Sequence, residues 1–206
     1  MELILPVSIG EGLDKLSILD IKLDKIQDER RFDVHKEFKL LLNQLMKYTI
    51  KYEFYYKMLK ATNLGIWDML DNIKNNKHNA LKKLELYEIM WNENDIRFRI
   101  KDRINNISNS SLKEKKGYAK TCVLFKINTF VDALRYYSFI YDEIDVLLLY
   151  ENDKVSPDSD INYISDITDK CYDKIYNFTE LTDINEIYKH LNITEEIKAR
   201  YKNILF

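Results

Sequence analysis

The chain is poor in the residues that build loops. Four glycines and two prolines among 206 residues amount to about 3% of the chain, where about 12% is average. This scarcity excludes most loop-built catalytic machinery, and no Walker loop, G-x-G-x-x-G or G-x-S-x-G motif occurs. We therefore expect a mostly helical protein with a substantial hydrophobic core, since 46% of its residues are hydrophobic.

Cysteine and histidine are also scarce. The two cysteines, Cys122 and Cys171, lie far apart and form no C-x-x-C pair, so the sequence predicts no disulfide framework and no zinc site. Both fall at apolar positions, which predicts that they are core residues. The three histidines lie in unrelated segments and show no metal-ligand spacing. We expect neither a metal nor a cofactor.

Neither sign of charge is in excess. Thirty-two Lys and Arg stand against 34 Asp and Glu, a net charge of −2, which argues against a nucleic-acid partner. No apolar run is long enough to span a bilayer, and the apolar start Met1–Leu5 is too short for a signal peptide. We expect a cytoplasmic protein without a membrane partner. Abundant Ile, Asn, Lys and Tyr indicate an AT-rich genome, as in some protists and large DNA viruses, and for a virus the compartment would be the host cytoplasm.

Apolar residues recur at helical spacing through the first 107 residues. Ser8 and Glu11 form a capping box, and the stripe that follows predicts a central helix from Ile9 to Ile26. Asp33 is a plausible N-cap for a long second helix that reaches Thr62. The broad apolar face Tyr48–Met58 indicates contact with two neighbouring helices or, as the alternative, a dimer interface.

Asn63 and Gly65 predict a break in the chain, followed by a short helix over 66–73. After a polar loop, a further long helix is predicted over 80–107. Its expected inward residues are Leu84, Tyr87, Trp91, Ile96, Ile100, Ile104 and Ile107. Trp67 and Trp91 are read as core residues, with sugar stacking as an alternative role for Trp67.

The C-terminal part allows two interpretations. The apolar spacing from Cys122 to Leu148 fits a single long helix, whereas strands over 122–127 and 144–150 flanking a helix are the alternative, because both runs are rich in strand formers. Residues 151–160 read as a linker, 161–178 as a helix, and Asp183 and Thr194 as caps of two last helices, the second of which ends at Phe206. The expected fold is an all-α bundle of long antiparallel helices, with a domain over 1–118 and a helical extension over 119–206. The alternative is a helical domain followed by a small α/β part.

Two polar sets are candidates for function. On the first helix, Glu11, Asp14 and Lys15 are the candidate catalytic residues, since a carboxylate beside an ammonium can transfer or position a proton. Lys22 projects on the same side. The alternative is an ordinary solvated face with helix-stabilising ion pairs.

The second polar set lies on the predicted helix over 80–107. It consists of Asn94, Arg97, Lys101 and Asn105, at offsets of three and four residues. Four donor-bearing side chains on one face suit a phosphate, sulfate or carboxylate ligand. A solvated charged face is again the alternative.

Four separated segments resemble an uncharacterised family in order and spacing. They read PVSIGEGLDKLSILDIKLDKI (6–26), IWDMLDNIK (66–74), NENDIRFRIKDRIN (92–105) and SLKEKKGY (111–118). The family is a small helical domain of unknown function in bacteria and phages, often encoded near glycosyltransferases or tetratricopeptide proteins. The resemblance covers about the first 120 residues, and the chain continues about 85 residues beyond it.

The resemblance implies that the two polar sets line one shared site. The family's polar and aromatic positions fall on Glu11, Asp14, Lys15, Lys22, Trp67, Asn94, Asp95, Arg97, Lys101, Asn105, Glu114, Lys116 and Tyr118. If the strand alternative holds, the C-terminal part could be a remnant of a sugar-related α/β domain.

Two functions remain open at this point. The first is a non-catalytic binding or adaptor module, accessory to glycan or surface-polymer assembly, with a protein partner or a homo-oligomer. The alternative is a cofactor-independent enzyme or sensor for a phosphate- or carboxylate-bearing small molecule. In that case Arg97, Lys101 and Lys15 would hold the anion, and Glu11 or Asp14 would act as acid or base.

Overall fold

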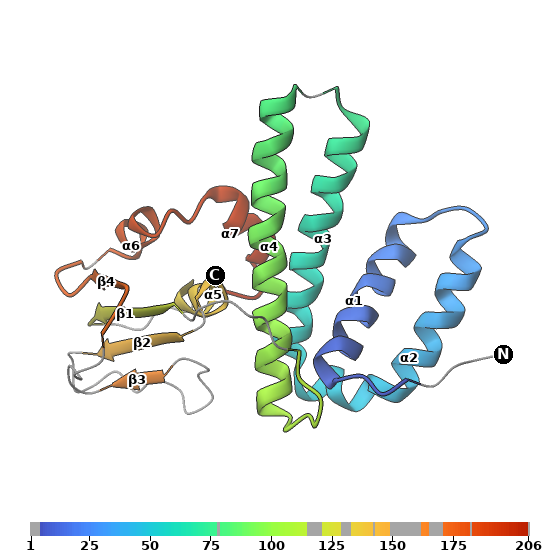
Figure 1. The fold of residues 1–206 in the computed structure, drawn as a ribbon, viewed down its shortest axis with the longest axis horizontal. Helices are drawn as coiled ribbons and strands as arrows, with labels where there is room; N and C mark the ends of the chain where they lie inside the picture. Colours follow the sequence, from blue (N-terminus) through green and yellow to red (C-terminus); the bar gives the residue numbers. More distant parts are fainter. Residues whose placement is uncertain are drawn as a thin grey trace. The chain divides into compact units, whose positions relative to one another are not determined.

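The chain divides into two compact units, residues 1–116 and 117–206. The first, which we call the helical unit, contains α1 to α4, and the second, the α/β unit, contains four strands and α5 to α7 (Figure 1). The fold is therefore mostly helical with a small α/β part. The computed structural model describes residues 5–77, 79–114, 121–128, 133–141, 143–148, 162–164, 171–181 and 183–205.

The first helix, α1 (Ile9–Lys25), is central in the helical unit, as predicted. The Ser8 hydroxyl accepts a hydrogen bond from the backbone N–H of Glu11 at 3.1 Å, which confirms the N-cap. The apolar side chains of α1 are buried against three other helices, α2, α3 and α4. Burial on several sides explains why the apolar positions of α1 form more than one stripe.

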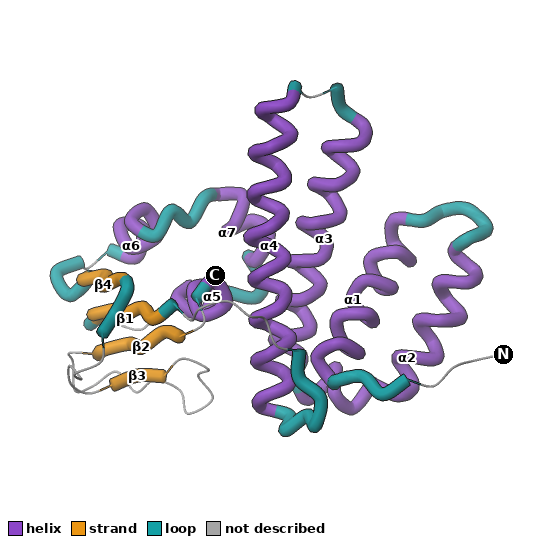
Figure 2. The backbone as a smooth tube through the Cα atoms, viewed as in Figure 1, coloured by secondary structure: helices purple, strands orange, loops and turns teal. Residues whose placement is uncertain are grey.

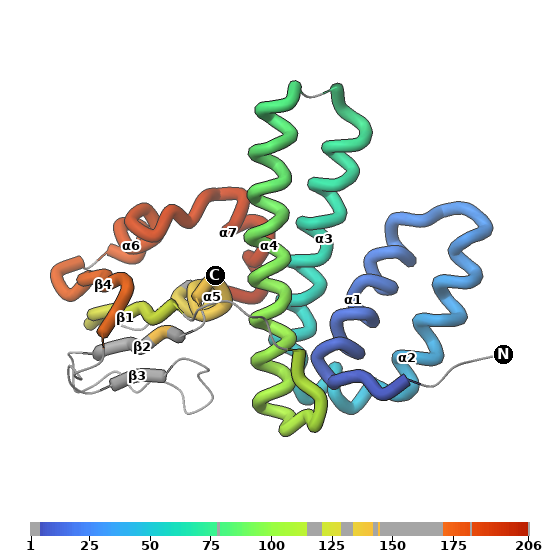
Figure 3. The backbone as a smooth tube through the Cα atoms, in the orientation of Figure 1, coloured from blue at the N-terminus to red at the C-terminus, as the bar shows by residue number. Residues whose placement is uncertain are grey.

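The predicted second helix is in fact two helices, α2 (Arg31–Lys51) and α3 (Glu53–Asn75). The backbone leaves helical geometry at Tyr52, where φ is −116° and ψ is 38°. Tyr52 is buried, and the change of direction lets both helices pack against α1 (Figure 3). No glycine or proline marks this turn, so its cause is tertiary packing.

The break expected at Asn63 and Gly65 is wrong, because α3 continues through both residues to Asn75. Each is buried inside the helix, where the packing of α3 outweighs the low helix propensity of asparagine and glycine. The broad face Tyr48–Met58 packs inside the unit, since Tyr52, Tyr55 and Met58 are buried. Contact with neighbouring helices is therefore the correct interpretation of that face.

The fourth helix, α4 (Ala80–Ile107), has the predicted bounds, and the Asn79 side chain caps it by accepting from the N–H of Lys82. Ile96, Ile100 and Ile104 are buried as expected. The other four predicted inward residues, Leu84, Tyr87, Trp91 and Ile107, are exposed. The α3–α4 hairpin extends beyond α1 (Figure 1), so the N-terminal half of α4 has α3 as a neighbour but lacks α1.

The α/β unit contains a parallel four-stranded sheet in the order β3-β2-β1-β4 (Figure 2). The single helix predicted across 122–148 is wrong, and the strand–helix–strand alternative is what occurs. Five of the six residues of β1 are buried, which is typical of a central parallel strand covered on both faces. The elements are β1 (Cys122–Ile127), α5 (Ala133–Ile140), β2 (Glu143–Leu148), β3 (Asn162–Ile164) and β4 (Lys174–Asn177).

The helix predicted over 161–178 is also wrong, because β3 and β4 lie within that range. In β4 and just after it, Ile175 and Asn177 are exposed, whereas Tyr176 and Phe178 stack with Phe125 of β1. That alternation is the period of a strand with one covered face. The predicted linker over 151–160 lies outside the described residues.

The last two helices, α6 (Ile184–His190) and α7 (Glu195–Tyr201), follow the predicted caps. Asp183 accepts from the N–H of Asn185, and Thr194 accepts from the N–H of Ile197. However, α7 ends at Tyr201 rather than at Phe206. Cys122 is buried as expected, but Cys171 is exposed, so its assignment to the core is wrong.

Candidate functional site

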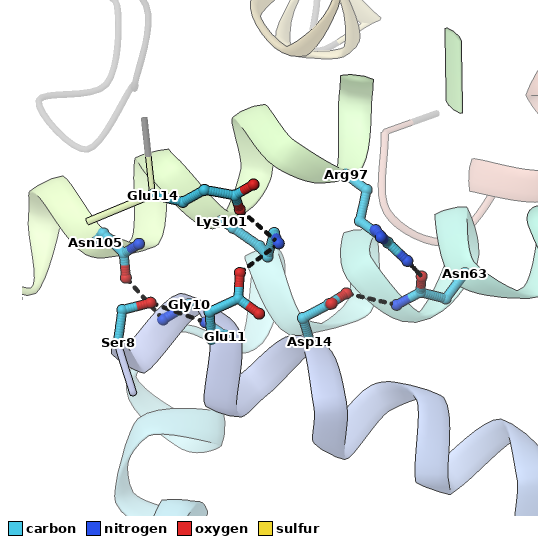
Figure 4. Close-up of polar contacts among 9 residues, drawn as sticks. All are labelled: Ser8, Gly10, Glu11, Asp14, Asn63, Arg97, Lys101, Asn105 and Glu114. Carbon is cyan, nitrogen blue, oxygen red and sulfur yellow. Dashed lines mark hydrogen bonds and ion pairs between the residues drawn. The ribbon is translucent and has the colours of Figure 1, made fainter. Parts of the chain in front are cut away.

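Polar groups from α1, α3 and α4, and from the segments just before α1 and after α4, meet inside the helical unit (Figure 4). Figure 4 shows them facing one another across the contact between α1 and α4, with α3 beside them. This polar cluster consists of Ser8, Gly10, Glu11, Asp14, Asn63, Arg97, Lys101, Asn105 and Glu114.

The N-terminus of α1 approaches α4 closely at Gly10. The Gly10 N–H donates to the Asn105 side-chain oxygen at 2.8 Å, in a buried position. A Cβ atom added to Gly10 would lie 2.6 Å from the carbonyl oxygen of Lys101, so only glycine fits. Ser8 and Asn105 together satisfy two of the N–H groups that a helix start leaves without intrahelical partners.

Lys101 is buried and holds two carboxylates. Its side chain is 8% exposed, and Nζ lies 2.5 Å from Glu11 Oε1 and 2.9 Å from Glu114 Oε2. Burial alone would lower the pKa of Lys101, but the hydrogen bonds to Glu11 and Glu114 and the charge of Asp14 offset it, so the pKa is raised. Lys101 is therefore charged, and the chain itself supplies its counter-ions.

Asn63 links all three helices of the polar cluster. Its side-chain amide donates to Asp14 Oδ1 at 2.8 Å and to the Ser17 hydroxyl at 2.9 Å. Its carbonyl oxygen accepts from Arg97 Nη1 at 3.4 Å. Asp14, Ser17 and Asn63 are all buried, and their mutual bonds remove most of the cost of burying polar groups.

Five of the predicted site residues meet in the polar cluster: Glu11, Asp14, Arg97, Lys101 and Asn105. Glu114, a polar position in the family that the sequence resembles, completes it. Sequence reasoning missed Gly10, Ser17 and Asn63. The pair of glycines inside a predicted helix, Gly10 and Gly12, was the available signal for a close helix contact.

The remaining predicted residues do not join the polar cluster. Lys15 faces α2 and forms an exposed ion pair with Glu37 at 2.6 Å. Lys22 is half-buried further along α1, and Asn94 is exposed. Trp67 is half-buried on α3, one turn beyond Asn63. Lys116 and Tyr118 lie outside the described residues.

Three predicted site residues contain a buried donor that finds no acceptor among the described residues. These donors are Trp67 Nε1, Arg97 Nε and Asn105 Nδ2. Asn105 as a whole is only 1% exposed. A buried donor without an acceptor costs about 1–3 kcal/mol, so each of them favours an acceptor from outside the described residues.

A second feature of the helical unit is an apolar surface on α4. We call Leu81, Leu84, Tyr87 and Trp91 the α4 stripe, and these side chains are 70%, 65%, 47% and 63% exposed. Their spacing of three, three and four residues places them on consecutive turns of one side. The buried residues Leu86, Ile96 and Ile100 lie on the opposite side of α4. Four large apolar side chains in one exposed row are unusual on a soluble surface.

The described part of the chain carries no sign of a metal site or of a membrane-spanning helix. It contains no group of three or more His, Cys, Asp or Glu side chains placed to hold a metal ion. None of the helices in it combines the length and the apolar character needed to cross a bilayer.

The comparisons with known proteins return nothing. No protein-family model matches the chain, and neither curated proteins nor solved structures include a match. The polar cluster and the α4 stripe are therefore the features of the helical unit that bear on function.

Proposed function

We propose that the helical unit is a non-catalytic protein-binding module that docks a helix of a partner protein on the α4 stripe. The observation that carries the proposal is the exposure of four large apolar side chains in one row of α4. In monomeric proteins such side chains are normally scattered, and a contiguous row of them indicates an interaction site.

The geometry of the polar cluster supports a non-catalytic role. An enzyme that uses Glu11, Asp14 and Lys101 would need them to face a substrate. Instead, Lys101 is hydrogen-bonded to Glu11 and Glu114, and Asp14 accepts from Asn63. Lys15, the third catalytic candidate, is occupied by Glu37 on another helix. An anionic substrate would have to displace the chain's own carboxylates.

The spacing of the α4 stripe favours a helix as the docked element. Leu84, Tyr87 and Trp91 follow the three-and-four alternation of the a and d positions of a heptad repeat, with Ala80 and Asn94 at the neighbouring d positions. A row of a and d residues forms the contact seam of a coiled coil, in which each side chain packs between side chains of a second helix. We call Leu84, Tyr87, Trp91 and Asn94 the seam of α4.

The proposal is tested by site-specific crosslinking. Tyr87 is replaced by a benzophenone-bearing amino acid, and the purified protein is irradiated alone at high concentration and in a lysate of its native cell. We expect one discrete product from position 87, lost in Leu84→Asp, and none from the matched control position Lys82, which is exposed off the stripe. Equal products from both positions, or no product from position 87, would overturn it.

The biological setting in this proposal is glycan or surface-polymer assembly in the cytoplasm. It follows from the resemblance of residues 6–118 to helical domains encoded near glycosyltransferases, which is an associational argument. Either a homo-oligomer or another protein of that assembly would fit the α4 stripe.

A second candidate function is favoured by the three buried donors. Trp67 Nε1, Arg97 Nε and Asn105 Nδ2 would suit a ligand rich in acceptor oxygens, such as a sugar phosphate or a dicarboxylate. A thermal-shift screen tests it, because a ligand at 100 times its Kd adds about 2.7 kcal/mol of stability. A shift that Trp67→Phe abolishes would favour this function, and no shift with any acceptor-rich compound would exclude it.

A further inference from the structure

We infer that the element docked on the α4 stripe is α4 of a second copy of this chain, in parallel orientation. The inference rests on the proposed function and names its partner. The register of the seam, the charges beside it and the sides of α4 that are already covered all point to this partner.

The register of the seam suits an identical, parallel partner. With Leu84 and Trp91 at a positions and Tyr87 at d, parallel pairing sets each residue opposite its own copy. Leucine, tyrosine and tryptophan layers then form in succession, and Asn94 would face the partner's Asn94. A polar layer of this kind fixes register in parallel helix pairs.

The charges beside the seam decide the orientation. Lys83, just before Leu84, and Glu88, just after Tyr87, occupy the g and e positions on opposite flanks of the seam. In a parallel pair the g residue faces the e residue five positions further along the partner, so Lys83 meets the partner's Glu88, and the reverse contact follows by symmetry. In an antiparallel pair the flank that holds Glu88 and Asp95 would face the same acidic flank of the partner. Opposite charges meet only in the parallel arrangement.

The rest of the helical unit leaves this side of α4 open. The opposite side is buried through Leu86, Ile96, Ile100 and Ile104, with α3 and α1 as its neighbours. A second α4 can therefore pack without disturbing the core. Three turns of helix bury less than the roughly 1,200 Å² of a standard stable interface, so we expect a weak dimer that depends on concentration.

Sedimentation equilibrium of the full chain tests the association. We expect the average mass to rise with concentration towards twice the monomer mass. Trp91→Asp should weaken dimerisation at least tenfold, because it places a charge in the seam. The matched control is Ile89→Asp, which changes an exposed apolar residue of α4 off the stripe. It should change the dissociation constant of the dimer by less than twofold. A monomer at all concentrations, or an equal effect of both substitutions, would overturn the inference.

Two further variants test the orientation. Lys83→Glu and Glu88→Lys should each weaken the dimer, and the double swap should restore it. In a Cys171→Ser background, Leu84→Cys and Trp91→Cys should each form a disulfide-linked dimer with oxidised glutathione, since each position faces its own copy. In an antiparallel pair, a positions face d positions, so Leu84→Cys or Trp91→Cys crosslinks instead to Tyr87→Cys when the variants are mixed, and that result would overturn the parallel arrangement.

The two proposals fail in different ways. If the purified chain is monomeric, the second copy is wrong; the protein-binding function then stands only if a lysate product forms from position 87, is absent from position 82 and is lost in Leu84→Asp. If position 87 gives no product in either condition, both are wrong.

Discussion

The two halves of α4 differ in their surroundings more than in their composition. The C-terminal half buries Ile96, Ile100 and Ile104 and also the polar residues Lys101 and Asn105. In the N-terminal half Leu86 is buried, whereas the four residues of the α4 stripe are exposed. Leucine, tyrosine and tryptophan thus face solvent while a lysine is buried, in one continuous helix.

Neighbouring helices, and not hydropathy, decide burial along α4. The C-terminal half contacts α1, where Gly10 lets the two backbones approach closely. The N-terminal half has α3 on one side, and within the helical unit α1 does not reach along its other side (Figure 1). The contrast predicts that substitutions at similar residues will have very different consequences in the two halves, and that the polar cluster is a stabilising contact.

The largest expected effect is that of a substitution in the buried half of α4. Ile100→Ala should lower the free energy of unfolding by about 4 kcal/mol, because it leaves a cavity at a fully buried position. The matched change Leu84→Ala should lower it by less than about 0.5 kcal/mol, since this side chain is largely exposed.

Urea unfolding followed by tryptophan fluorescence checks both, because the two tryptophans, Trp67 and Trp91, lie in the helical unit. The protein is kept dilute, so that association does not contribute. A large loss in Leu84→Ala would mean that the α4 stripe is covered within one chain.

The next largest effect concerns the close approach of α1 to α4. Gly10→Ala should cost about 3 kcal/mol, because its Cβ would meet the backbone oxygen of Lys101 and force the helices apart. The control is Gly12→Ala, whose Cβ would meet flexible side-chain carbons of Leu45 at 3.2 Å. We expect that variant to differ from the parent by less than about 1 kcal/mol. Equal losses would show that helix geometry, and not this contact, sets the requirement for glycine.

The contact between α1 and α4 also marks the limit of what the sequence predicts. Arg97, Lys101 and Asn105 could be placed on one face of a helix, because that depends on a spacing of four residues along one element. Their partners Gly10 and Asn63 lie on other helices, and no spacing within α4 indicates them. For the same reason, the sequence does not show that Lys101 pairs with Glu11 whereas Lys15 pairs with Glu37, because each partner lies on another helix.

Element boundaries show the same division between local and tertiary causes. Both ends of α4 were predicted, because a local asparagine cap and a polar stretch mark them. The turn at Tyr52 has no local signal and depends on packing against α1. The runs 122–127 and 143–148 fit both helix and strand spacing, and pairing with strands distant in sequence decides between them. The mostly helical character was predictable from the low glycine and proline content, and the sheet was not.

A smaller effect is expected from breaking the ion pairs of the polar cluster. Lys101→Met should lower the free energy of unfolding by about 2 kcal/mol. The loss stays below that of a fully buried pair because Glu11 and Glu114 are 41% and 43% exposed and can regain water. The control Lys15→Met removes an exposed pair and should cost at most about 0.5 kcal/mol. If the Lys101 variant is as stable as the parent, the polar cluster does not stabilise the fold, and a ligand-binding role gains support.

The smallest expected effect is a loss of stability in alkali that depends on Lys101. Its pKa is raised above the ordinary value of 10.5 by Glu11, Glu114 and Asp14, against the opposing effect of burial. The folded state therefore holds this proton more tightly than the unfolded state. The resulting stabilisation is complete below pH 10.5 and is lost as the pH rises through the folded-state pKa. Tyr56 contributes with the same sign, because burial and its hydrogen bond to Asp20 raise its pKa as well.

Unfolding free energies between pH 9 and about pH 11.5 separate the two contributions. The parent should lose stability over this range, and Lys101→Met and Tyr56→Phe should each lose less. Because the first variant removes a charged group of the polar cluster and the second a hydroxyl between α1 and α3, their effects should add. Trp91→Ala, on the solvent side of α4, should lose as much unfolding free energy over this pH range as the parent does. A Lys101→Met variant with the parent's pH dependence would mean that Glu11 and Glu114 do not hold the lysine proton in the folded state, which would weaken the contrast between the two halves of α4.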